Sequence, residues 1–78
     1  MNYIKSVLPM KDYRLLVEME GGSTIIADLS GKLHTIKYAE LADEALFKTV
    51  TTDGDYLTWG CGKLCLTVNE LMEVVLLG

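Results

Sequence analysis

The sequence predicts an α+β domain, with an antiparallel sheet of five or six strands, a short middle helix and a C-terminal helix. Two hairpin signals and one helix-start signal carry this prediction. Stretches with apolar residues at alternate positions surround Gly21-Gly22 and Asp53-Gly54, two pairs that suit two-residue hairpin loops. Thr67-Val68-Asn69-Glu70 has the spacing of a capping box, which marks the start of a helix.

The length and composition indicate a single domain, residues 1–78, with a core of its own. Half of the 78 residues are hydrophobic, which excludes a disordered chain. Eleven acidic residues against seven basic ones give a formal net charge of −4, and the basic residues are scattered. We therefore expect no direct binding of nucleic acid, which depends on Lys and Arg at phosphates. An acidic surface is better suited to a basic protein partner.

The sequence also predicts a location in the cell. No stretch is long enough to span a bilayer, and the first residues lack the charged and apolar regions of a signal peptide. We expect a cytoplasmic protein with no membrane partner. In that compartment Cys61 and Cys65 would be reduced thiols.

The first half of the chain is predicted to contain three strands and a turn. The strands are expected at 3–8, 13–20 and 23–28, and the turn at 28–31. Pro9 should end the first strand because proline has no N–H for a ladder bond. A two-residue loop at Gly21-Gly22 would place Val17 opposite Ile26, both facing the core. Asp28 should cap the turn by accepting backbone N–H groups.

The second half is predicted to contain helical turns, three strands and the closing helix. The helical turns are expected within 38–46, the strands at 48–52, 55–59 and 64–66, and the helix at about 68–76. A two-residue loop at Asp53-Gly54 would place Val50 opposite Leu57. Leu57 and Trp59 should then be buried on the same face of the sheet.

The order of certain residues between positions 3 and 72 is similar to that of a known family. In the first half these are Ile4-Lys5-Ser6-Val7, Asp12-Tyr13-Arg14-Leu15, Gly22 and Asp28. In the second half they are Tyr38, Leu41, Asp43, Phe47-Lys48-x-Val50, Trp59, Gly62 and Glu70-Leu71. Together they resemble domain of unknown function 2442, a small bacterial α+β domain.

The resemblance implies a protein without established catalytic activity. Members of the family occur alone or joined to a DNA-binding helix-turn-helix, often encoded beside another small domain as in toxin–antitoxin pairs. This chain departs from the family after Trp59, where Gly60-Cys61-Gly62 stands in place of Pro-Asn-Gly followed by an acidic residue. It also carries no helix-turn-helix, so the resemblance implies neither a role for an acidic loop nor a route to DNA.

No set of residues predicts a reaction or a metal site. Cys61 and Cys65 are separated by three residues, which is the spacing of neither a redox pair nor a zinc knuckle. His34 has no predicted nucleophile and orienting carboxylate beside it. We therefore expect no catalytic residue, no metal and no cofactor. The alternative is a small ligand-binding domain or enzyme with a cleft near Asp28, His34 and Trp59.

The predicted C-terminal helix is apolar on nearly its whole circumference, which is more than one thin sheet can cover. Val68, Leu71 and Val75 form the stripe expected to face the sheet. The candidate interaction surface consists of Met72, Leu76 and Leu77. Packing within the chain's own core and docking on a second chain both account for it. The sequence favours a non-enzymatic protein-interaction or regulatory module, antitoxin-like by resemblance, whose simplest association is a homodimer.

Overall fold

The computed structural model describes residues 3–77 and, for side chains, residues 3–75. Its strands are β1 (Ile4–Met10), β2 (Arg14–Met19), β3 (Thr24–Asp28), β4 (Thr51–Thr52), β5 (Tyr56–Trp59) and β6 (Leu64–Thr67). Its helices are α1 (Glu44–Phe47), α2 (Val68–Leu77) and 3₁₀ turns at Lys11–Tyr13, Ser30–Lys32 and Ala39–Ala42. The α+β class is confirmed, as are the helical turns predicted within 38–46 and the closing helix.

The strands form two three-stranded antiparallel sheets, in the orders β1-β2-β3 and β4-β5-β6. The prediction of one sheet of five or six strands is therefore wrong. Residues 29–50, which contain turns and short helical segments only, separate the strands of the two sheets along the chain. The N–H of Ile4 donates to the carbonyl of Gly54 (2.8 Å), which brings the edge of β1 next to the β4–β5 loop.

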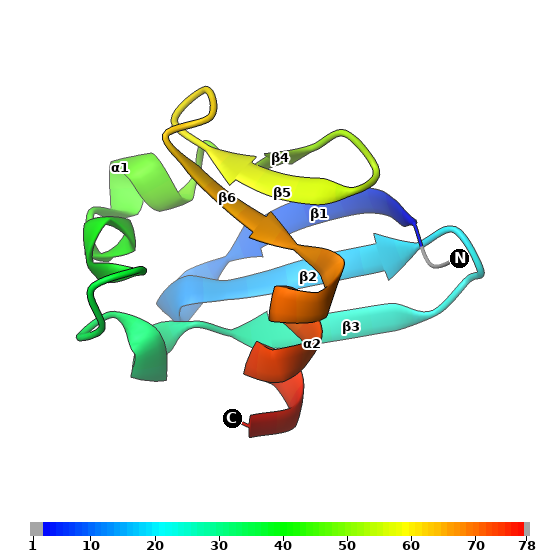
Figure 1. Ribbon diagram of the computed structural model, residues 1–78, viewed down its shortest axis with the longest axis horizontal. Coiled ribbons are helices and arrows are strands. Elements are labelled where there is room, and N and C mark those ends of the chain that lie inside the picture. Colours follow the sequence, from blue (N-terminus) through cyan, green and yellow to red (C-terminus); the bar gives the residue numbers. More distant parts are fainter. Residues whose placement is uncertain (1–2, 78) are drawn as a thin grey trace.

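The core lies between the first sheet and the layer formed by β5, β6 and α2. Figure 1 shows β6 and α2 crossing in front of the first sheet. The largest fully buried side chains are Trp59, Leu15, Leu29, Leu41, Leu57, Leu66, Leu71 and Val17. The apolar face of the first sheet is covered by the layer of β5, β6 and α2, and that layer is covered in turn by the first sheet. A single flat sheet would need a much larger layer of helices to cover it.

The loop of the first hairpin has three residues, 20–22, instead of the predicted two. The N–H of Met19 donates to the carbonyl of Ser23 (2.8 Å), and the N–H of Gly22 donates to the carbonyl of Met19 (3.0 Å). Gly22 has a φ of 95°, so a type I turn is followed by a left-handed glycine, the usual three-residue hairpin.

The longer loop shifts β3 by one residue and reverses its faces. Val17 lies opposite Ile25, so the predicted pair of Val17 with Ile26 is wrong. Ile26 is 58% exposed, whereas Ala27 is fully buried. The physical reason is Asp28, which the predicted register would have placed on the buried face. The observed register turns this carboxylate to solvent.

The second hairpin also has a longer loop, but its faces are as predicted. Thr52 lies opposite Leu57, which leaves a four-residue loop, and the predicted pair of Val50 with Leu57 is wrong. The carboxylate of Asp53 accepts the N–H groups at positions 55 and 56 (both 3.0 Å), which favours this wider turn. Because the shift is two residues, Leu57 and Trp59 still face the core and are fully buried, as predicted.

The end of β1 and the start of α2 were both predicted from local sequence. β1 continues past Pro9, which lies opposite Leu15, so the predicted end of this strand is wrong; an edge strand tolerates proline. The capping box is confirmed. The N–H of Glu70 donates to Oγ1 of Thr67 (3.1 Å), and Oε1 of Glu70 accepts the N–H of Thr67 (3.0 Å).

Candidate functional site

The predicted surface on α2 is only partly within the described side chains. Met72 is partly buried, and the side chains of Leu76 and Leu77 lie outside the described residues. Leu71 and Val74 are buried, whereas Val75 is 37% exposed, so the prediction that Val75 faces the sheet is wrong. A spacing of three residues, rather than four, brings Val74 to the buried side of α2 beside Leu71.

A different apolar surface lies on the side of the first sheet turned away from the core. Residues 15, 17 and 19 of β2 are buried, so residues 14, 16 and 18 point outward. With their neighbours on β1 and β3 they form three rows: Met10–Arg14–Asp28, Leu8–Leu16–Ile26 and Ser6–Glu18–Thr24. We call these nine residues the outer face.

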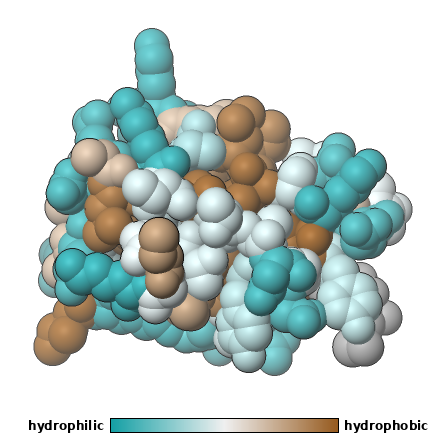
Figure 2. All heavy atoms as spheres, turned by 90° about the horizontal axis from the view of Figure 1, so that it is seen from above, coloured by the Kyte–Doolittle hydropathy of each residue, from teal (hydrophilic) through white to brown (hydrophobic). Residues whose placement is uncertain are grey.

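The middle row of the outer face is entirely apolar. Leu8 is 57% exposed and Ile26 is 58% exposed, and Leu16 between them is partly exposed. On the side of the molecule seen in Figure 2, apolar atoms reach the surface in several separate places among polar ones. On the outer face, by contrast, the apolar residues are neighbours across three hydrogen-bonded strands.

Charged side chains flank this row on both sides. Nε of Arg14 lies 3.6 Å from Oδ2 of Asp28, and Nζ of Lys5 lies 3.7 Å from Oε1 of Glu18. The side chains of Arg14, Asp28 and Glu18 are 52%, 48% and 47% exposed. Exposed ion pairs of this kind contribute at most about 1 kcal/mol to stability. Their charges therefore remain available to a partner.

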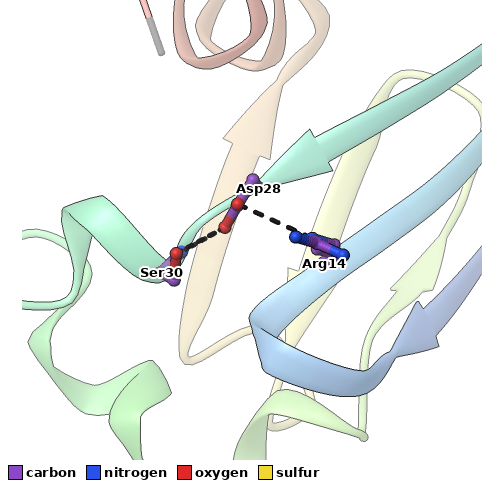
Figure 3. Close-up of polar contacts among 3 residues, drawn as sticks. All are labelled: Arg14, Asp28 and Ser30. Carbon is purple, nitrogen blue, oxygen red and sulfur yellow. Dashed lines mark hydrogen bonds and ion pairs between the residues drawn. The ribbon is translucent and has the colours of Figure 1, made fainter.

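Asp28 is held in place by the turn that follows β3. Its Oδ1 accepts the backbone N–H of Ser30 (2.9 Å) and the hydroxyl of Ser30 (2.6 Å), which confirms its predicted capping role. Figure 3 shows the carboxylate between Ser30 and Arg14. The hydroxyl and N–H of Ser30, and then the charge of Arg14, hold the pKa of Asp28 below its usual value.

The cleft considered near Asp28, His34 and Trp59 is not a shared site. Asp28 is exposed on the outer face of the first sheet, whereas Trp59 belongs to the second sheet and is fully buried in the core. His34 is exposed in the turns after Lys32. The indole N–H of Trp59 has no hydrogen-bond partner among the described residues.

A hollow of about 570 Å³ lies instead between the β1–β2 turn and α1. Asp12 and Tyr13 in this turn have φ values of 61° and 60°, in the left-handed region that non-glycine residues rarely adopt. The hydroxyl of Tyr13 donates to the carbonyl of Ala42 (2.6 Å), and its ring meets that of Phe47 edge to face, with centroids 5.3 Å apart. The sequence did not predict this hollow, because the contacts that form it join distant segments.

The charges around this hollow have both signs. Lys11 and Lys48 line it together with Asp12 and Glu44. The mixture of charges indicates no particular class of ligand.

Cys61 lies in a turn and Cys65 lies on β6, and both are free and exposed. Within residues 3–77, no three potential metal ligands from His, Cys, Asp and Glu are grouped together. In the same range no helix has the length and apolar character needed to cross a membrane.

The fold and the outer face thus define a small α+β domain with an exposed apolar sheet surface. Comparisons of the chain with protein-family models, curated proteins and solved structures found no match. The resemblance to domain of unknown function 2442 therefore rests on the residues quoted above, and the functional argument rests on the surface.

Proposed function

We propose that this chain is a non-enzymatic protein-interaction module with a regulatory role, and that it binds through the outer face. The supporting observation is the apolar row of Leu8, Leu16 and Ile26, exposed between charged side chains. Burying a large aliphatic side chain completely contributes about 1.5–3 kcal/mol. Covering the exposed halves of Leu8 and Ile26 would therefore favour association by about 1 kcal/mol each.

The proposed partner is a protein rather than a nucleic acid or a membrane. The net charge of −4 and the scattered lysines disfavour phosphate backbones and favour a basic protein. An antitoxin-like role in the cytoplasm is the form of this proposal that the family resemblance and the acidic charge support.

The test compares two isoleucines. Ile26 belongs to the outer face, whereas Ile36 is fully exposed in a turn and serves as the matched control. A tagged chain is purified from its native cell, and its partners are identified by mass spectrometry. Ile26→Asp should abolish recovery of the partner, and Ile36→Asp should leave it unchanged, with circular dichroism confirming that both variants are folded. Equal recovery with both variants would exclude the outer face as the binding surface.

A second candidate function is ligand binding at the hollow beside Tyr13. Its volume lies in the range of small-molecule sites, and the left-handed φ of Tyr13 is the kind of strain that gathers at functional sites. A thermal-shift screen with small metabolites tests this candidate. A compound that stabilises the wild type, but not Lys48→Glu, would support it.

A further inference from the structure

We propose that the outer face binds a second copy of the chain, about a two-fold axis that runs along the row Leu8–Leu16–Ile26. This proposal rests on the proposed function, because it uses the same surface and names its partner. It differs from the homodimer predicted through α2, since the contact is made by β1, β2 and β3.

The pattern of charges on β2 supports this geometry. Arg14 lies two residues before Leu16 and Glu18 lies two residues after it, so opposite charges stand about 7 Å on either side of an apolar centre. A two-fold axis along the middle row places each residue of that row opposite the same residue of the second copy. It also places each of the two outer rows opposite the other outer row of the second copy. Arg14 then lies over Glu18 of the second copy, and the contact occurs twice.

The other face-to-face arrangement is electrostatically unfavourable. An axis parallel to β2 would also cover the apolar row, but it would place Arg14 over Arg14 and Glu18 over Glu18 of the second copy. Like charges facing each other across an interface oppose binding. With a net charge of −4 on each chain, general repulsion also opposes association, so the two local Arg14–Glu18 pairs must select the arrangement.

The dimensions of packed sheets are compatible with these pairs. Aligned sheets pack about 10 Å apart with their strands rotated by about 30°. This rotation displaces Arg14 sideways from Glu18 of the second copy by only about 3–4 Å, a distance that two long side chains can span. A face of three short strands is smaller than the roughly 800 Å² per partner of a stable complex. We therefore expect a weak dimer, with a Kd in the micromolar range.

The experiment is a charge exchange followed by sedimentation analysis between about 1 µM and about 1 mM. Arg14→Glu and Glu18→Arg should each weaken the dimer by about tenfold or more, because like charges then face each other. The double variant should recover a Kd close to that of the wild type, because both pairs are restored with their signs reversed. Lys48→Glu and Glu44→Arg are the controls, since they make the same changes of net charge at exposed positions on or next to α1.

Circular dichroism confirms the fold of each variant, and Arg14→Gln and Glu18→Gln replace any variant that does not fold. A wild type that is monomeric at the highest concentration overturns the proposal. So does a dimer that the single charge changes leave intact, or that the double variant fails to recover. If the wild type is monomeric but Ile26→Asp still loses a partner from the native cell, the second copy is excluded while the proposed function stands. If Ile26→Asp also keeps every partner, the proposed function fails as well.

Discussion

Two adjacent leucines on β2 should lose very different amounts of stability on the same substitution. Leu15 is fully buried in the core, whereas Leu16 lies on the outer face and is partly exposed. Truncating a buried leucine to alanine removes about 2–5 kcal/mol, because apolar contact is lost and a cavity remains. The same change at Leu16 should cost about 1 kcal/mol or less, because solvent already reaches this side chain.

These costs are large relative to the stability of so small a domain. A free energy of unfolding of about 0.05–0.15 kcal/mol per residue gives about 4–12 kcal/mol for the whole chain. Leu15→Ala should therefore remove a large part of the stability, and it should lower the Tm by about 10 °C or more. Leu16→Ala should lower the Tm by about 8 °C or less.

Urea unfolding followed by tryptophan fluorescence measures both changes. Trp59 is the single tryptophan of the chain and is fully buried, so its emission reports directly on the opening of the core. The protein should be kept at about 1 µM, because association would add to the apparent stability. If Leu16→Ala is as destabilising as Leu15→Ala, with both m-values unchanged, the assignment of the two faces of β2 is wrong.

Loop geometry, helix capping and the charge of Asp28 give three more tests. Gly22→Ala should cost about 1–2 kcal/mol, because alanine is strained at a φ of 95°. Gly21→Ala should be nearly neutral, since Gly21 has no positive φ; equal losses in urea unfolding would instead indicate the two-residue loop. Thr67→Ala should cost about 1 kcal/mol through loss of the cap on α2, seen as a lower Tm by circular dichroism, and an unchanged Tm would refute this role. The charged form of Asp28 stabilises the fold above the ordinary pKa of about 4, and this stabilisation is lost as the pH falls through the lower folded pKa. Asp28→Asn should therefore make the fall in Tm below about pH 4 shallower, and an identical acid profile would contradict it.

The features that the sequence determined by itself are local ones. The capping box of Thr67 and Glu70, and the capping of its turn by Asp28, involve residues two or three positions apart, so spacing alone specifies the contacts. The alternation that places Leu57 and Trp59 inside follows in the same way from the period of a strand.

The tertiary structure decided what local spacing left open. Ile25-Ile26-Ala27 is a continuous apolar run, so either register of β3 offers an apolar residue to the core. The choice depended on keeping Asp28 out of the core, and it turned Ile26 outward to complete the outer face. The division into two sheets was likewise decided by burial, because the apolar face of the first sheet is covered by β6 and α2 from the other end of the chain. The candidate site could not be predicted for the same reason: it consists of residues that the packing of distant segments left uncovered.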